Sequence, residues 1–202
     1  MTVILPRTGI REAAAVIRAG GIVAIPTDTV YGLAADPFQP GAVERLFRLK
    51  GRPENKPILL LVDSRLQVER LTARLPATFD RVAARFWPGP LSIILPAADH
   101  LPARITAGVG SIALRMPGST VVRRLIGAAR TPLTGTSANR SGRAPALSAR
   151  QVCEQFPAAP LWVLDGGPSQ SSAPSTILDL TGEPRILREG AVPAAEVLCC
   201  LG

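Results

Sequence analysis

The sequence has 202 residues, enough for one well-packed domain and too few for two of ordinary size. Hydrophobic residues make up 47% of it and aromatic residues 4%, which predicts a core of alanine, valine, isoleucine and leucine. No apolar run approaches the ~20 residues that cross a bilayer, and residues 1–7 do not resemble a signal peptide. We therefore expect a cytoplasmic protein without a membrane segment.

The formal net charge of +8 indicates polyanionic ligands, either nucleotides or nucleic acid. Part of this charge reflects composition, because all but two of the 23 basic residues are arginines. The two lysines, Lys50 and Lys56, lie in one seven-residue window. Three cysteines and one histidine, His100, leave few ligands for zinc and few partners for disulfide or histidine-dependent catalysis. His100 lies in a polar segment and is expected in a solvated loop.

Apolar periodicity and turn residues predict the elements in chain order. The first helix is expected to be capped by Thr8, to bury a stripe from Ile10 to Ile17, and to end at two glycines. A buried strand over 22–25 follows, then a threonine-rich connection and a helix over 41–49. The stripe of that helix continues to Lys50, which places a cation on its buried face. The other predicted helices are 64–71, 76–86, 120–129, 149–155 and one from 193. The other predicted strands are 57–62, 91–95, 111–116, 133–135, 161–164, 176–180 and 185–187.

Helices and strands interleave without strict alternation, which favours an α/β fold with a twisted mixed parallel and antiparallel sheet and flanking helices. No internal repeat or linker divides the chain, so we expect a single domain over 1–202. The polar segment 136–148 is rich in serine, glycine, proline and arginine and is the best candidate for a mobile functional loop.

Residues 50–57 form the densest polar cluster, Lys-Gly-Arg-Pro-Glu-Asn-Lys-Pro. A lysine point charge beside the guanidinium of Arg52 suits a polyphosphate or a phosphate and a carboxylate. The alternative is that basic residues close a helix end against its dipole. We favour this alternative for Arg48 and the ligand for Lys50.

Three further groups of polar residues each have a functional and a structural interpretation. Residues 134–142 place hydroxyl and amide groups after a strand, where they could close around phosphate oxygens or form an ordinary turn. Residues 26–33 could hold an amino acid or stabilise a strand connection. Arg115 and Arg188, at strand ends, could clamp an anion or form surface ion pairs. P-loop, nucleophile-elbow and dinucleotide-binding motifs are missing or misplaced.

Seven motifs stand in the same order in the YrdC-like threonylcarbamoyl-AMP synthases, a family that the sequence resembles from its first helix to about Gly190. They are Pro-Thr-Asp-Thr-Val-Tyr-Gly-Leu at 26–33, Lys-Gly-Arg-Pro at 50–53, Trp-Pro-Gly-Pro-Leu at 87–91, Ala-Leu-Arg-Met-Pro at 113–117, Thr-Ser-Ala-Asn-x-Ser-Gly at 136–142, Pro-Ser-Thr-Ile at 174–177 and Leu-Arg-x-Gly at 187–190.

The resemblance implies a deep, positively charged cleft and the conversion of L-threonine, bicarbonate and ATP to threonylcarbamoyl-adenylate and pyrophosphate. The implied ATP-binding set is Lys50, Arg52, Lys56, Ser137, Asn139 and Arg188, with Lys50 and Arg52 as the catalytic pair. The implied threonine-binding set is Thr29, Tyr31, Arg115 and Ser175. Mg²⁺ is expected on the phosphates, held largely by them and by water, without protein ligands.

The sequence departs from the family pattern at Leu61, where longer relatives often carry a histidine that contacts threonine. No residues remain for the extra carboxyl-terminal domain of those relatives, so the sequence resembles the short bacterial form, which passes its product to a transferase complex acting on tRNA. Two rival functions stay open. One is a basic module that binds double-stranded RNA or tRNA without catalysis, and weak RNA binding is also compatible with the enzyme. The other is the related carbamoyl-adenylate-forming domain of hydrogenase-maturation proteins.

Overall fold

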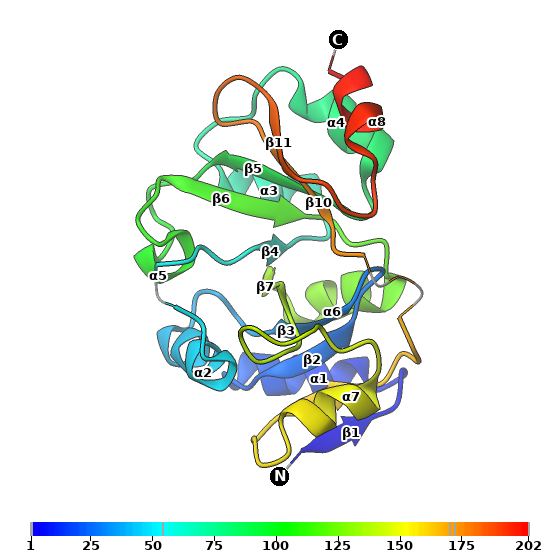
Figure 1. Cartoon of the computed structure of the whole chain (residues 1–202). Helices are drawn as coiled ribbons and strands as arrows, with labels where there is room; N and C mark the ends of the chain where they lie inside the picture. The colour runs from blue at the N-terminus through cyan, green and yellow to red at the C-terminus, as the bar shows by residue number, and fades with distance from the viewer. Residues whose placement is uncertain (1, 54, 170, 172, 202) are drawn as a thin grey trace.

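The computed structural model describes residues 2–53, 55–169, 171 and 173–201, whose strands form two sheets, one above the other in Figure 1. In the lower sheet the order is β1 (Val3–Leu5), β9 (Trp162–Leu164), β2 (Val23–Pro26), β3 (Tyr31–Ala34) and β8 (Thr136–Ser137). In the upper sheet it is β11 (Arg185–Arg188), β10 (Thr176–Asp179), β5 (Leu91–Pro96), β6 (Ser111–Arg115), β4 (Leu60–Leu61) and β7 (Leu133–Thr134).

Both sheets mix parallel and antiparallel pairs, which confirms the predicted mixed α/β class. In the lower sheet β9 runs parallel to β1 and β2, while β3 runs antiparallel to β2 and β8. In the upper sheet β5 is parallel to β10 and antiparallel to β6. The division of the strands between two sheets is a feature that the sequence did not predict.

Helices flank both sheets. They are α1 (Ile10–Arg18), α2 (Pro40–Lys50), α3 (Arg65–Leu71), α4 (Phe79–Phe86), α5 (Ala103–Thr106), α6 (Thr120–Ala129), α7 (Ala149–Gln155) and α8 (Ala194–Cys199). Helices α1 and α6 pack against each other and against β2, and α3, α4 and α8 lie beside the upper sheet (Figure 1). The termini lie at opposite ends of the molecule (Figure 1). Within the described residues no helix is both long and apolar enough to cross a membrane.

Helix α2 follows its predicted pattern and determines where its last residue lies. The buried positions Ala42, Val43, Leu46 and Phe47 form the predicted stripe, and Lys50 continues it with 4% of its surface exposed. Gly51 then adopts φ = 61°, a left-handed conformation that ends the helix and that glycine adopts at little cost. The helix therefore delivers an ammonium group into the interior, as the stripe predicted.

Three sequence predictions need correction. The first helix has Gly9, not Thr8, at its N-cap, and no side chain caps it. The strand predicted over 57–62 is reduced to Leu60–Leu61. Residues 31–34, expected within a connection, form strand β3, because their backbone groups pair with β2 on one side and β8 on the other. Such pairing comes from segments distant in sequence, which local periodicity does not report.

Thr134 joins the two sheets. It belongs to β7, yet its backbone N–H donates to Ala35 O at 3.0 Å, immediately after β3. Its buried hydroxyl donates to Leu33 O at 3.1 Å and accepts from Ala35 N at 2.9 Å. One residue thus links β7 of the upper sheet to the end of β3 in the lower sheet.

We expect Thr134→Val to lower the free energy of unfolding by about 1–3 kcal/mol, because it leaves a buried N–H and a buried carbonyl without their hydroxyl partner. Urea denaturation followed by circular dichroism measures this change. Thr78→Val is a suitable control, since the Thr78 side chain makes no capping hydrogen bond to α4. A Thr134→Val protein as stable as the wild type would show that the hydroxyl does not stabilise this junction.

Candidate functional site

Lys50 ties the end of α2 to the segment that follows β8. Its Nζ donates to the backbone O of Ser137 at 2.5 Å and of Asn139 at 3.0 Å. It also contacts Ser137 Oγ at 3.3 Å and Asn139 Oδ1 at 3.0 Å. An ammonium carries three N–H donors, so these four acceptors surround it fully. The structure therefore brings together three residues of the implied ATP-binding set, and their contact with phosphate stays a prediction.

The Asn139 side chain holds the following loop in place. Its Nδ2 donates to the backbone O of Arg140 at 2.9 Å and of Arg143 at 2.7 Å. In addition, Ser141 N donates to Lys50 O at 2.8 Å. The beginning of the segment 136–148 is thus bonded to the helix end by several hydrogen bonds.

Arg52 and Lys56 differ in their surroundings. Arg52 is partly buried and its Nη2 donates to Pro57 O at 2.6 Å, while its buried Nε has no hydrogen-bond partner among the described residues. Burial lowers the pKa of Arg52. Lys56 is exposed. A partly buried guanidinium with an unsatisfied N–H is suited to receive an anion, whereas Lys56 stands in solvent.

The pKa of Lys50 is lowered from 10.5 to about 8, first by burial and second by the charge of Arg52. Since the folded value lies below the unfolded one, the unfolded chain binds more protons between pH 8 and pH 10.5, and this group makes stability rise with pH in that window. In the folded protein, the positive charge that would attract phosphate is lost as the pH rises through about 8.

We therefore expect the Kd for ATP, measured without other substrates, to rise above pH 8, by at most about tenfold per pH unit. Calorimetric titrations at about pH 7 and about pH 9 measure the effect. ATP binding just above pH 8 should also take up protons, visible in buffers of different ionisation enthalpy. An affinity that stays constant between these two pH values would contradict a role for the Lys50 charge.

Arg115 ends β6, and its buried guanidinium is bonded on several sides. Its Nε donates to Gly89 O at 2.9 Å and its Nη1 to Thr29 Oγ1 at 3.0 Å. Its Nη2 forms an ion pair with Asp28 Oδ1 at 2.7 Å. Burial lowers the pKa of Arg115 and the Asp28 carboxylate opposes this shift. Hydrogen bonds therefore use two of the five N–H donors, and Nη2 makes the ion pair with Asp28 without a hydrogen bond. The structural interpretation of Arg115 as a surface ion pair is wrong, because the side chain is 4% exposed.

Ser175 and Arg188 lie together at the ends of β10 and β11. Arg188 donates from Nη2 to Ser175 O at 2.7 Å and to Ser175 Oγ at 3.3 Å. Ser175 Oγ also hydrogen-bonds Ser92 Oγ at 2.8 Å. Burial lowers the pKa of Arg188, and the nearby positive charge of Arg115 lowers it further. Two guanidinium groups therefore approach each other here, an arrangement that an anion between them would stabilise.

Tyr31 is fully buried, and its hydroxyl is already bonded by the segment 165–167. It donates to Gly167 O at 2.8 Å and accepts from Gly166 N at 3.2 Å. Desolvation raises the pKa of the phenol. Tyr31 therefore anchors this segment, and its ring borders the site.

A small cavity of about 40 Å³ is lined both by Ser137, which Lys50 contacts, and by Arg115. It has room for groups the size of one or two water molecules. Its lining includes Thr29, Tyr31, Leu61, Arg115 and Ser137. Leu61 pairs with Arg115 between β4 and β6, so an apolar side chain stands beside the guanidinium. Gly135 leaves room for Leu61, because a Cβ atom at that glycine would lie 2.8 Å from Leu61 Cγ.

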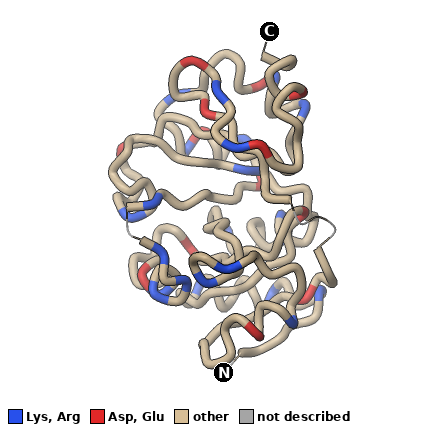
Figure 2. The backbone as a smooth tube through the Cα atoms, in the orientation of Figure 1, with Lys and Arg blue, Asp and Glu red and all other residues tan. Residues whose placement is uncertain are grey.

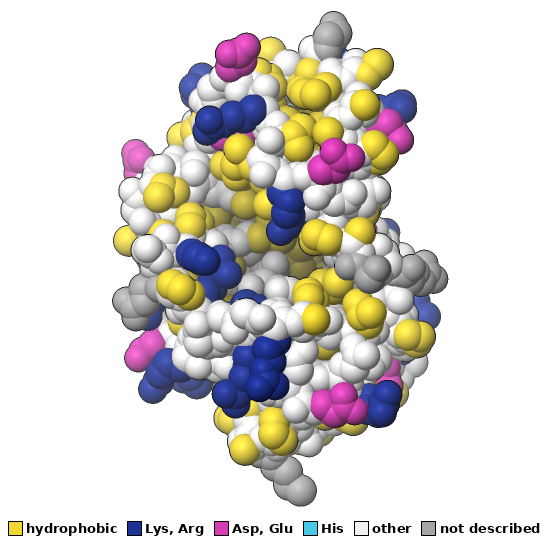
Figure 3. Space-filling view, viewed as in Figure 1, with side chains coloured by type: hydrophobic (Ala, Val, Ile, Leu, Met, Phe, Trp, Pro, Cys, Tyr) yellow, Lys and Arg dark blue, Asp and Glu magenta, His cyan; other side chains and the backbone are white. Residues whose placement is uncertain are grey.

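The surface is hollowed between the two sheets, and lysine and arginine side chains border the hollow in Figure 3. Along the backbone, Lys and Arg positions occur in the segments of both the upper and the lower sheet (Figure 2). The predicted depth and net charge of this cleft stay predictions. His100, as expected, lies exposed in a loop. No group of three or more histidine, cysteine, aspartate or glutamate side chains that could hold a metal ion occurs within the described residues.

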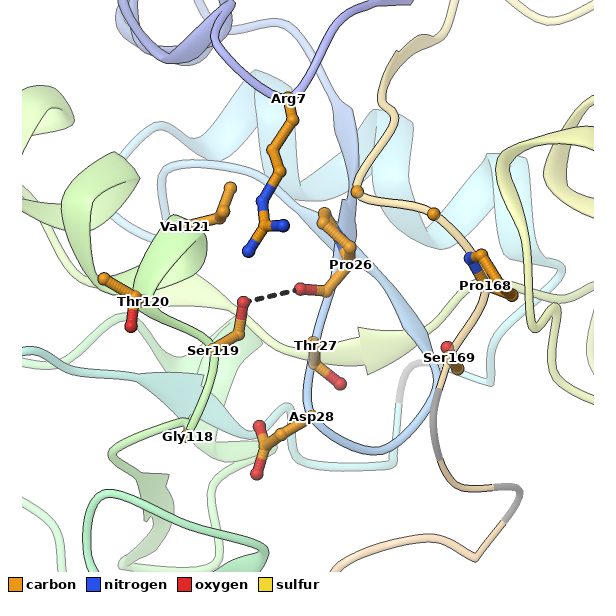
Figure 4. A pocket seen from close by; sticks show the side chains of 12 residues that line it. Arg7, Pro26, Thr27, Asp28, Gly118, Ser119, Thr120, Val121, Pro168 and Ser169 are labelled. Atoms are coloured by element: carbon orange, nitrogen blue, oxygen red, sulfur yellow. Dashed lines mark hydrogen bonds between the residues drawn. The ribbon is translucent and has the colours of Figure 1, made fainter.

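A second pocket of about 280 Å³ lies on the other side of the residue 27–29 turn, between the start of α6 and the segment 166–169 (Figure 4). Arg7, Ser119 and Asp28 line it, and Ser119 Oγ donates to Pro26 O at 2.8 Å. Asp28 belongs to the motif at 26–33, but the sequence alone does not indicate a role for it. The one feature of the sequence that could have indicated a role for Asp28 is its position directly before Thr29, which was already assigned to the site.

The fold and the site together define a class: mixed α/β proteins in which hydroxyl side chains and a buried arginine line one small cavity beside a buried lysine. The family model Sua5_yciO_yrdC, described as telomere recombination, matches residues 15–190. The chain belongs to this Sua5/YciO/YrdC family.

Known relatives agree with this assignment. A threonylcarbamoyl-AMP synthase of Pyrococcus abyssi is 40% identical over 96% of this chain and 57% of its own length. A putative threonylcarbamoyl-AMP synthase of Mycobacterium tuberculosis is 39% identical over 96% of this chain and 89% of its own. The crystal structure of P. abyssi Sua5 complexed with L-threonine has a TM-score of 0.95 and 37% identity, covering 100% of this chain and 61% of that one. The chain thus spans little more than half the length of the P. abyssi relative.

Proposed function

We propose that this chain is a threonylcarbamoyl-AMP synthase, which converts L-threonine, bicarbonate and ATP to threonylcarbamoyl-adenylate, pyrophosphate and water. The observation that carries the proposal is one cavity lined both by Ser137, which the buried Lys50 contacts, and by the buried Arg115. The names of the relatives and the threonine complex of P. abyssi Sua5 support it.

The proposed reaction brings together anions that repel one another. The amine of threonine and bicarbonate form an N-carboxylate and release water, and an oxygen of this carboxylate attacks the α-phosphorus as pyrophosphate leaves. Lys50 and Arg52 would offset the charge of the phosphates, beside Ser137 and Asn139, with Arg188 near the nucleotide. Arg115, Thr29 and Ser175 would hold the threonine. Positioning and charge stabilisation can supply most of the acceleration, so no histidine base is needed.

Mg²⁺ fits this site as a companion of the nucleotide rather than as a resident ion. The described residues offer no acidic cluster, and Mg²⁺ is commonly held by substrate phosphates and water. When bound, it would offset phosphate charge, and Lys50 and Arg52 would supply the rest.

Pyrophosphate release tests the proposal. The protein is incubated with labelled ATP, threonine and bicarbonate, and each component is omitted in turn. Release that requires both threonine and bicarbonate supports the synthase, whereas RNA binding without turnover would support the binding module instead. Release that requires carbamoyl phosphate in place of threonine would support the carbamoyl-adenylate-forming domain. Valine in place of threonine reports how far Leu61 weakens recognition of the threonine hydroxyl.

The unstable adenylate would pass to a transferase complex that modifies tRNA. Incubation of the protein with such a complex and tRNA tests this step, and modified tRNA should depend on both. Direct RNA binding by this chain is expected to be weak and sensitive to salt, because it would rest on dispersed arginines.

A further inference from the structure

Asp28 supplies the negative charge in the immediate surroundings of Arg115. Gly89 O and Thr29 Oγ1, which accept hydrogen bonds from that guanidinium, are neutral, whereas Asp28 Oδ1, which forms the ion pair with it, carries charge. A buried guanidinium without a counter-charge is costly, so the ion pair governs how the side chain sits. Asp28 belongs to the same turn as Thr29, which ties the position of both groups to one backbone segment.

The carboxylate of Asp28 is itself closely confined. Both of its oxygens are shielded from solvent, and neither accepts a hydrogen bond from the described residues, which leaves the ion pair with Arg115 to offset its burial. Its side chain is directed at the backbone of Gly118 (Figure 4). A Cβ atom at Gly118 would lie 2.9 Å from Asp28 Oδ2, closer than real Cβ contacts, and 3.1 Å from Cγ, which is tighter than most of them, so the Asp28 side chain would have to move. Because Gly118 has no positive φ, the missing side chain matters for space rather than for backbone conformation.

A role of Asp28 through its charge and a role through its position predict opposite effects of its removal on carboxylate binding. Arg115 and Arg188 repel each other, and Asp28 offsets one of their two positive charges. If Asp28 acted through its charge alone, its removal would leave a more positive site and strengthen the binding of a carboxylate. If it acts through position, its removal would release the guanidinium to turn towards other acceptors and weaken that binding.

We propose that Asp28 is a positioning residue that orients the guanidinium of Arg115 towards the carboxylate of the amino-acid substrate, and that Gly118 keeps the space in which its carboxylate sits. The inference rests on the proposed function, since it assigns Arg115 to the amino acid. It predicts that a change at Gly118, which alters no charge, weakens threonine binding in the same way as a change at Asp28.

Calorimetric titration with L-threonine compares the wild type with Asp28→Asn and Gly118→Ala. Gly182→Ala is the matched control, since nothing lies within 4 Å of a Cβ atom at that glycine. Asp28→Asn and Gly118→Ala should each raise the Kd for threonine by about tenfold or more and leave the Kd for ATP within about twofold of the wild-type value. In the pyrophosphate assay they should raise the KM for threonine more than they lower kcat. Gly182→Ala should match the wild type.

Each other outcome has a defined meaning. Tighter or unchanged threonine binding by Asp28→Asn overturns the proposal, as does wild-type affinity in Gly118→Ala. A rise in the Kd for ATP equal to that for threonine also overturns it, since that indicates general damage. If Asp28→Asn does not fold, judged by circular dichroism, Gly118→Ala decides the question. Failure of the wild type to bind threonine overturns the proposed function together with this inference, whereas wild-type binding with unaffected variants overturns this inference alone.

Discussion

Replacing Lys50 or Arg52 with alanine is expected to reduce pyrophosphate release by about 10²–10³-fold, the effect typical of removing one group that stabilises charge in a transition state. Lys50 also organises Ser137 and Asn139 through its four short contacts, so its loss removes a charge and releases the loop together. Arg52 makes one described hydrogen bond, to Pro57 O, so its loss should disturb the structure less.

Arg48→Ala is the matched control for this experiment. Arg48 lies two residues before Lys50 on α2, its side chain is 69% exposed, and it pairs with Glu44 at 3.6 Å. An exposed pair of this kind contributes little to stability, so activity should stay near the wild-type level. Near-normal turnover by Lys50→Ala or Arg52→Ala, with the fold intact by circular dichroism, would show that the phosphate assignment is wrong.

The second large effect is expected at Arg115. Arg115→Ala should raise the KM for threonine about 10- to 150-fold, because a charge-assisted bond to a carboxylate contributes about 1.5–3 kcal/mol. It should also destabilise the fold by about 3–5 kcal/mol, since it leaves the buried Asp28 carboxylate without its partner. Arg115→Lys keeps the charge but cannot reproduce three directed contacts, so its KM should lie between these extremes.

The effect of losing Arg115 on stability can be measured separately from its effect on threonine binding. In the double variant Asp28→Asn with Arg115→Met no buried charge lacks a partner, so it should recover much of the lost stability without recovering threonine affinity. Thermal unfolding and threonine titration on the same samples measure both. Restored threonine binding in the double variant would contradict a direct role for Arg115.

Local sequence determined the helices with clear polar and apolar faces. The bounds predicted for α6 and α7 agree with the structure, and serines accept a backbone N–H at both helix starts. The buried position of Lys50 followed from the stripe of α2. Each of these features depends on residues within about two helical turns, which is the range that periodicity and capping rules cover.

Short strands and the division into two sheets depended on distant partners. Strand β3 has two buried strands as neighbours, and β8 exists because residues 136–137 pair with it. The hydroxyl of Tyr31 was expected near the substrate, yet it is bonded by residues more than 130 positions away. The sequence alone does not show whether the hydroxyl of a tyrosine or a threonine binds a substrate or a backbone carbonyl.

The ordered motifs of the sequence determined the family and nominated nearly every residue of the candidate site. What they could not determine was which of these side chains meet one another. Two such pairs are Lys50 with Asn139, which are 89 positions apart, and Arg115 with Asp28, which are 87 positions apart. The members of each pair meet because the fold buries their side chains in the same place. Only the tertiary structure determines these contacts, because a buried charge is stable only when it is paired, and its partner can come from any part of the chain that the fold brings beside it.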